Sequence, residues 1–146
     1  MSASTPVRSP RETAELLLRT VAAGTRDELA DLYAPDVRIV NVWAPGGPST
    51  SEGREPMRAR MKATADLWDF ESVADVALHE TAEPEVVIAE YRVNGRIRST
   101  GAAFSLGFVS VLRIVDGLIA DARDYSNPQE TGELTALLEA AGISLG

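Results

Sequence analysis

The chain has no cysteine and only one histidine in its 146 residues. Without cysteine it can form no disulfide, no thiolate nucleophile and no Cys-ligated zinc or iron–sulfur site. A single histidine also excludes a two-histidine metal centre or a histidine-pair relay within one copy. Any chemistry must therefore use carboxylates, arginine, tyrosine and amides, and we expect neither a metal nor a cofactor.

Positive charge is scarce as well, because 14 Lys and Arg stand against 22 Asp and Glu, a formal net charge of -8. Surfaces that bind nucleic acid or anionic lipid need a positive field, so we expect neither partner. The longest uncharged run, Ser99 to Leu112, is interrupted by glycine and serine and is too short to span a bilayer. Residues 1–10 lack the apolar core of a signal peptide, so we expect a cytoplasmic location.

The length and composition otherwise fit one folded domain. Hydrophobic residues make up 45% of the chain and charged residues 25%, which is enough apolar material for a core. A chain of this size is too short for two ordinary domains. Residues 1–9 are rich in Ser, Thr and Pro and are expected to form a flexible N-terminal arm, followed by a single domain over residues 10–146.

Helix signals dominate the first third of the chain. Ser9, Pro10 and Glu12 combine an N-cap, a proline at the first helical position and a capping-box glutamate, so we expect a helix that Gly24 ends. A second, short helix should end before Pro35.

A strand, a loop and a third helix are expected next. The β-branched run from Val37 to Trp43 predicts a strand that enters a long loop at Pro45 to Pro48. A third helix is expected from about Arg54 to Trp68.

The second half of the chain is mostly extended. A hairpin signal at Asn94-Gly95 competes with one at Ser99 to Gly101, and we favour the latter because it divides the region into strands of matching length. Asn94-Gly95 then becomes a bulge or bend. Thr131 is expected to cap a final helix. The four predicted strands cover Glu71 to Thr81, Val86 to Arg98, Ala102 to Val115 and Leu118 to Ser126.

The resulting order is α-α-β-α-β-β-β-β-α, which predicts an α+β fold. We expect one long, curved antiparallel sheet with the helices packed on one side. Such a sheet makes a cone whose open end encloses a pocket.

Two stretches give this order a family resemblance. Residues 85–97 read Glu-Val-Val-Ile-Ala-Glu-Tyr-Arg-Val-Asn-Gly-Arg-Ile, and residues 116–128 begin Asp-Gly and end Arg-Asp-Tyr-Ser-Asn-Pro. Together they resemble the nuclear transport factor 2-like superfamily, the cone fold of ketosteroid isomerase, SnoaL-like polyketide cyclases and limonene epoxide hydrolase. The pattern is most similar to the phenazine-biosynthesis A/B proteins. The resemblance covers about residues 11–143 and implies a fold that hosts enzymes of several classes as well as binding modules.

The resemblance implies catalytic roles for four polar residues. Asp124 matches the pocket carboxylate that acts as general base or acid in the epoxide hydrolase and, as a glutamate, in the phenazine proteins. Asn41 falls where the hydrolase has an asparagine that positions the attacking water. Arg92 and Asn94 fall where the hydrolase has an arginine and an acidic aspartate.

Three features of these relatives are missing. Asn94 can donate a hydrogen bond but cannot protonate a substrate oxygen, so the hydrolase's Asp-Arg-Asp relay is incomplete. The isomerase base late on the first strand is absent, because apolar residues and Asn41 occupy that region. The helix-borne histidine of the phenazine proteins has no counterpart, since the third helix offers only Arg58, Arg60 and Lys62 there.

Strand alternation lets the four polar residues each project to one side, so they can converge. We expect Asp124 to move a proton while Asn41, Arg92 and Asn94 hold a developing oxyanion. Burial disfavours the carboxylate and a nearby arginine favours it, which places the pKa of such a group near the working pH. Substrate-binding apolar walls are expected from Trp43, Trp68, Tyr91, Phe104, Leu106, Phe108, Met57 and Met61.

Each polar residue also has a structural interpretation. Asp124 could belong to an inter-strand ion pair with Arg92 or Arg113. Asn41 could be a structural amide bonded to a bulge, and Arg92 a surface or dimer residue.

The sequence thus leads to a cofactor-independent acid–base enzyme of small-molecule, secondary metabolism, such as antibiotic biosynthesis. It would be a SnoaL-like cyclase, isomerase, dehydratase or hydrolase that acts on a small apolar carbonyl or epoxide substrate. One alternative is a non-catalytic small-molecule-binding or scaffolding protein of the same fold, and another is protein recognition of the nuclear-transport type through an exposed apolar patch at the cone mouth. The outer face of the sheet needs a cover, which predicts a homodimer.

Overall fold

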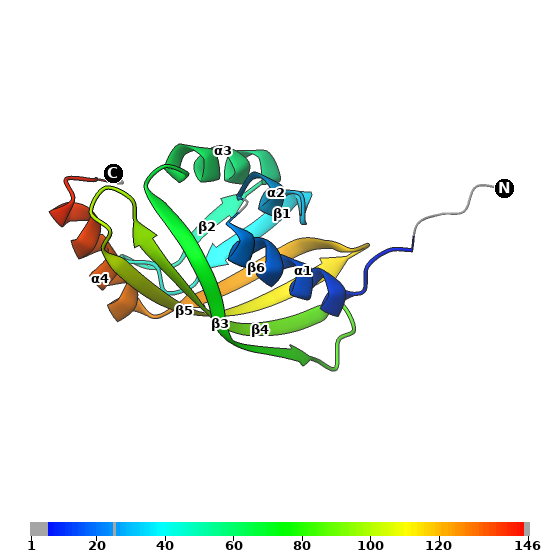
Figure 1. The fold of residues 1–146 in the computed structure, drawn as a ribbon. Coiled ribbons are helices and arrows are strands. Elements are labelled where there is room, and N and C mark those ends of the chain that lie inside the picture. Colours follow the sequence, from blue (N-terminus) through cyan, green and yellow to red (C-terminus); the bar gives the residue numbers. More distant parts are fainter. Residues whose placement is uncertain (1–5, 25, 145–146) are drawn as a thin grey trace.

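The computed structural model describes residues 6–24 and 26–144, which form four helices and one curved six-stranded sheet (Figure 1). None of the helices in these two ranges is long and apolar enough to cross a bilayer. The helices are α1 (Pro10–Ala23), α2 (Arg26–Ala30), α3 (Arg54–Thr64) and α4 (Pro128–Ala140). The strands are β1 (Tyr33–Asn41), β2 (Ser49–Glu52), β3 (Trp68–Glu80), β4 (Val86–Ile97), β5 (Ala103–Val115) and β6 (Leu118–Ser126).

The strand order across the sheet is β2-β1-β6-β5-β4-β3, and one pair departs from the expected antiparallel arrangement. β1 runs parallel to β6, whereas the other neighbours are antiparallel. A parallel pair needs a long connection, and here the chain passes through β2, α3 and three more strands between the two. The sheet is therefore mixed. β2 replaces part of the predicted loop, and its four polar residues give no apolar alternation that would reveal a strand.

Several predicted ends shift by a few residues. α1 begins as expected, because Ser9 and Glu12 form the reciprocal capping box. α2 ends at Ala30, so β1 already starts at Tyr33. α3 ends at Thr64, and Trp68 opens β3 instead of closing the helix. Of the expected N-terminal arm, residues 1–5 lie outside the described ranges.

The start of α4 also differs from the prediction. Its N-cap is Asn127 rather than Thr131, because the Asn127 side chain accepts the backbone N–H of Gln129 and Pro128 occupies the first helical position.

The predicted turn at Ser99 to Gly101 is confirmed, and a second tight turn joins β5 to β6. β4 and β5 are joined between Ile97 and Ala103, so the turn lies at residues 98–102 and not at Asn94-Gly95. The expected irregularity at Asn94-Gly95 appears in the partner strand, where β3 pairs Phe70 with Gly95 and Ser72 with Asn94 and so leaves one extra residue. Asp116 and Gly117 both have positive φ, as a two-residue turn between antiparallel strands requires.

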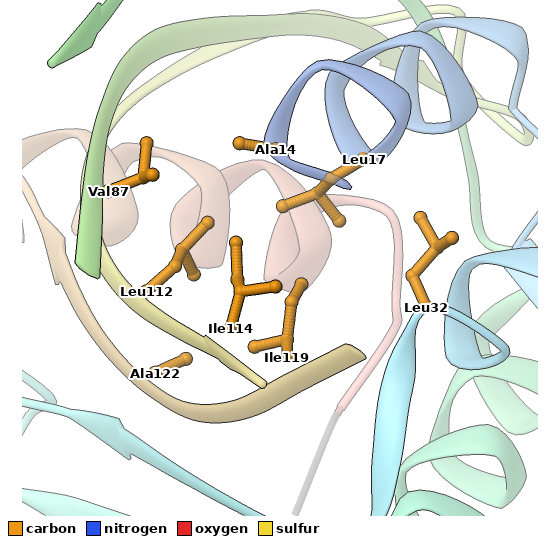
Figure 2. Packing of buried hydrophobic residues seen from close by; sticks show 8 residues of the cluster. All are labelled: Ala14, Leu17, Leu32, Val87, Leu112, Ile114, Ile119 and Ala122. Atoms are coloured by element: carbon orange, nitrogen blue, oxygen red, sulfur yellow. The ribbon is translucent and has the colours of Figure 1, made fainter. Parts of the chain in front are cut away.

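The main core lies between α1 and one face of the sheet, which we call the inner face and define by Val87, Leu112 and Ala122. Figure 2 shows these side chains directed toward Ala14 and Leu17 of α1. The opposite, outer face carries the alternate residues, among them Arg92 and Val109. A second cluster joins Ile97 and Phe104 to Leu138 of α4, which Figure 1 shows at the end of the sheet beside the β4–β5 hairpin.

Candidate functional site

Asp124 lies on the inner face, two residues beyond the core residue Ala122 on β6. The register places it directly opposite Ser110 of β5 on one side and Asn41 of β1 on the other. All three side chains project to the same face, because directly paired residues of neighbouring strands do so. The parallel pairing of β1 with β6 is thus what brings Asn41 to Asp124.

The Asp124 carboxyl group is held by a serine rather than by an arginine. The Ser110 hydroxyl, which is only 1% exposed, donates to Oδ1 of Asp124 over 2.8 Å. The other oxygen, Oδ2, accepts no hydrogen bond from the described residues, and Asp124 as a whole is half-buried. The alternative ion pair is not formed, because Arg92 binds Glu130 and Arg113 binds Glu83 and Glu85.

Tyr91 extends this contact to a third strand. Its hydroxyl oxygen lies 3.2 Å from Oγ of Ser110. Because Ser110 uses its single proton on Asp124, Tyr91 is the donor in this pair when Asp124 is ionised. The Tyr91 ring stacks on Phe108, with ring centres 5.4 Å apart. A chain of hydroxyl groups therefore leads from β4 through β5 to the carboxylate on β6.

Burial governs the electrostatics of this cluster. Burial raises the pKa of Asp124 above its usual value, and the hydrogen bond from Ser110 opposes that rise. Burial and the charge of Asp124 raise the pKa of Tyr91, and the same two causes raise the pKa of Tyr33 on β1 well above its usual value. Both phenols therefore stay protonated near neutral pH, so they can act as hydrogen-bond donors beside a carboxyl group that can exchange a proton.

Asn41 leaves a buried polar atom without a partner. Its amide oxygen has no hydrogen bond among the described residues. Such an atom costs free energy unless water or a ligand satisfies it. Asn41 therefore does not use this oxygen to bond to a bulge, as the structural interpretation expected. A donor group of a ligand could bind to the oxygen instead.

We predict a pH-dependent gain in stability for Asp124→Asn. Because the pKa of Asp124 is raised in the folded protein, wild-type stability falls as the pH rises from about 3.8, the ordinary value, through the folded pKa. The variant lacks this loss, so its melting temperature should exceed that of wild type at pH 7.5 and approach it near pH 4. Asp116→Asn, at an exposed turn that asparagine tolerates, is the control for the loss of one carboxyl group. A wild-type advantage at pH 7.5 would contradict the burial argument.

Arg92 and Asn94 do not join Asp124. Arg92 and Asn94 lie on the outer face of β4. Asp124 instead pairs with Ser110, which pairs with Ala89, and these three residues lie on the inner face. Arg92 forms a 2.6 Å ion pair with Glu130 of α4. Asn94 bonds to the hydroxyls of Ser72 and Ser105. The expected convergence of all four polar residues is therefore wrong, and two of them converge.

The expected apolar walls are divided among several places. Trp43 is 54% exposed and packs edge-on against Tyr125 of the outer face, 5.2 Å between ring centres. Trp43, Tyr91 and Phe108 line a hollow of about 420 Å³ that Arg92 and Glu130 also border. Trp68, Phe104 and Leu106 belong to the cluster under α4. Met57 of α3 is buried, and Met61 is half-buried.

The residues that the sequence did not single out are Ser110, Tyr33 and Glu130. Ser110 had a detectable signal, because it is a polar residue in phase with Leu112 and Ile114 in an apolar strand. Tyr33 had none, since the sequence placed it in a helix. The contact of Glu130 with Arg92 depends on how α4 packs against the sheet, which the sequence does not show. Within residues 6–24 and 26–144, no group of three or more His, Asp and Glu side chains is arranged to hold a metal.

Comparisons with known proteins give the same fold. A family model described as a SnoaL-like domain matches residues 14–122. The chain is 33% identical over 125 residues to an uncharacterised PhzA/B-like protein of Pseudomonas aeruginosa, covering 85% of this chain and 88% of that protein.

Two solved structures are similar at lower identity. One is a Bacillus subtilis protein proposed to be an isomerase, with a TM-score of 0.77, 23% identity and coverage of 87% of this chain and 92% of that chain. The other is SalBIII, an epoxide hydrolase/cyclase-like enzyme in pyran ring formation of the polyether salinomycin, with a TM-score of 0.67, 16% identity and coverage of 83% and 92%. At these identities the likeness shows the fold alone.

Proposed function

Because the chain belongs to the SnoaL-like domain family of the nuclear transport factor 2-like superfamily, we propose that it is an acid–base enzyme of small-molecule, secondary metabolism. Its reaction would be a cyclisation, isomerisation, dehydration or hydrolysis of a small apolar carbonyl or epoxide substrate. SalBIII is described as epoxide hydrolase/cyclase-like and the B. subtilis neighbour as a proposed isomerase, and both kinds of reaction move protons.

The single observation that carries this proposal is the state of Asp124. It is a half-buried residue whose carboxyl pKa is raised by desolvation, with one oxygen held by Ser110 and no hydrogen bond to the other from the described residues. That combination suits a general base, because a carboxylate with a raised pKa binds a proton more strongly than an exposed one, and its second oxygen accepts no hydrogen bond from the described residues.

The remaining roles follow from what surrounds Asp124. The unpartnered amide oxygen of Asn41 would accept a hydrogen bond from an attacking water or a substrate hydroxyl. The Tyr33 hydroxyl, a protonated donor close enough to respond to the charge of Asp124, would carry the oxyanion role expected of Arg92 and Asn94. No arginine binds Asp124 within the described residues, so an uncharged substrate fits better than an anionic one, which the carboxylate would repel.

A test need not know the natural substrate. We would incubate the protein in D₂O with a panel of small ketones and follow deuterium entry next to the carbonyl by NMR, and with small epoxides in ¹⁸O water and follow labelled products by mass spectrometry. The expected result is catalysed exchange or ring opening for at least one apolar member, lost in Asp124→Asn. Exchange that persists in the variant would contradict the assignment.

The second candidate is a ligand-binding protein without catalysis. The observation that favours it is the outward direction of Arg92 and Asn94, which leaves one carboxylate where the epoxide hydrolase pattern has a relay. A ligand that co-purifies and is returned unchanged, with no exchange across the panel, would support this candidate.

We also propose a homodimer through the outer face. Ile88, Val109 and Val111 are neighbours there by register, and Arg123 and Glu90 lie beside them with opposite charges, so the patch can complement its own copy across a two-fold axis. Wild type should elute at dimer mass in light-scattering chromatography at micromolar concentration. Val109→Arg should shift it to monomer, and Val76→Arg, exposed on edge strand β3, should not. A monomeric wild type would contradict the proposal.

A further inference from the structure

We propose that Ser110 and Tyr91 are positioning residues of this site, whose hydroxyl chain holds Oδ1 of Asp124 and leaves Oδ2 as the atom that exchanges a proton with the ligand. The catalytic meaning of this chain rests on the proposed function, whereas its effect on the carboxyl group can be measured without turnover. Tyr91 thus has a polar role in addition to the apolar wall expected from the sequence.

The geometry is built into the sheet. Ser110 faces Asp124 in the β5–β6 register, and Tyr91 lies one row away on β4, paired with Phe108. The distances of 2.8 Å and 3.2 Å along the chain are those of hydrogen bonds. Stacking on Phe108 fixes the Tyr91 ring, and Ser110 is almost fully buried, so the donors have little freedom to turn elsewhere.

The number of available protons decides which hydroxyl group donates to which. An ionised Asp124 can only accept, so Ser110 must donate to Oδ1 and is left to accept from Tyr91. Each donor in such a chain polarises the next, which strengthens the bond that reaches the carboxylate. Proton uptake at Oδ2 leaves both bonds in place, so the carboxyl group can change its protonation state without rearranging the site.

The hydrogen bonds of the hydroxyl chain offset the desolvation of Asp124. A hydrogen bond to the charged form favours that form, so Ser110 limits the rise that burial alone would cause. The titratable groups whose pKa responds to the charge of Asp124 within the described residues are Tyr33 from β1 and Tyr91 from β4. Arg123 and Tyr125, its neighbours on β6, project from the outer face, and α1 presents apolar side chains to the inner face.

The test is a direct titration of Asp124. ¹³C NMR of protein labelled at the aspartate side-chain carboxyl carbon, with Asp124→Asn to assign the signal, gives its midpoint in wild type and variants. Ser110→Ala should move the midpoint to higher pH, because the ionised form loses its donor. Tyr91→Phe should move it in the same direction by less, since Ser110 still donates but is no longer polarised.

Ser126→Ala is the matched control. Ser126 is also a buried serine of the inner face, 8% exposed and one alternation beyond Asp124 on the same strand, but it makes no hydrogen bond to the carboxyl group. Its removal should leave the midpoint of Asp124 in place. An unchanged or lower midpoint in Ser110→Ala, relative to Ser126→Ala, overturns the proposal.

The outcomes separate this proposal from the proposed function. If Ser110→Ala shifts the titration but no substrate is turned over, the hydroxyl chain stands and the enzymatic proposal fails. If turnover is found and depends on Asp124, but Asp124 has the same titration midpoint in Ser110→Ala as in wild type, only the proposal of the hydroxyl chain fails. If both hold, the acidic limb of the rate profile should move to higher pH in Ser110→Ala together with the NMR midpoint.

Discussion

Replacing Asp124 with asparagine is expected to lower kcat/KM by roughly 100- to 10,000-fold, the usual contribution of a general acid or base. Asparagine has nearly the same shape, and its amide oxygen can still accept the hydrogen bond from Ser110. What it loses is the ability to take up or release a proton at the position of Oδ2. The measurement is the turnover of whichever ketone or epoxide the wild type accepts.

The loss should not come from unfolding. The variant removes a buried charge, so its melting temperature at neutral pH should equal or exceed that of wild type, and its far-UV spectrum should be unchanged. Asp121→Asn, three residues earlier on β6, serves as a control and should retain full activity. Turnover that survives in Asp124→Asn would move the chemistry to another residue.

Gly95→Ala is expected to destabilise the protein by about 3 kcal/mol and to lower the melting temperature by roughly 10 °C. A Cβ at this position would overlap the backbone oxygen of Asp69 and lie 2.5 Å from Cζ of Phe104. Neither group can move cheaply, because Asp69 is part of the β3–β4 ladder and Phe104 is packed in the cluster under α4. Thermal and urea unfolding of the purified variant give the value.

Gly132→Ala is the matched comparison for Gly95→Ala. Gly132 lies within α4, and a Cβ there meets nothing within 4 Å. Alanine should stabilise this helix by about 0.5–1 kcal/mol. If both variants shift stability in the same direction and by similar amounts, close approach of the β3 backbone does not explain the glycine at position 95.

The local elements of this fold were largely predictable from the sequence. Ser9, Pro10 and Glu12 encode a capping box whose donors and acceptors lie within four residues, so it needs no tertiary contact to form. The Asp116-Gly117 turn is equally local. β2 was missed because its polar residues show no strand pattern and are ordered by pairing with β1, and the predicted ends of α2 and α3 lie a few residues beyond the observed ones.

The candidate site was predictable only in part. Periodicity shows that Arg92 and Asn94 share one face of their strand, but it does not show which face that is relative to Asp124. The answer depends on the register between strands, and a shift of one residue would have exchanged the faces. Ser110 therefore binds the Asp124 carboxylate and Tyr91 binds Ser110, whereas Arg92 binds Glu130.

The sequence by itself determined what kinds of chemistry this protein can carry and where its chain turns. Composition excludes thiol and two-histidine chemistry, and short-range patterns specify caps, turns and apolar faces. The tertiary structure alone decided which polar groups meet, because β1 and β6 pair in parallel although four strands separate them in the chain. Burial, which no local pattern measures, then raised the pKa of Asp124.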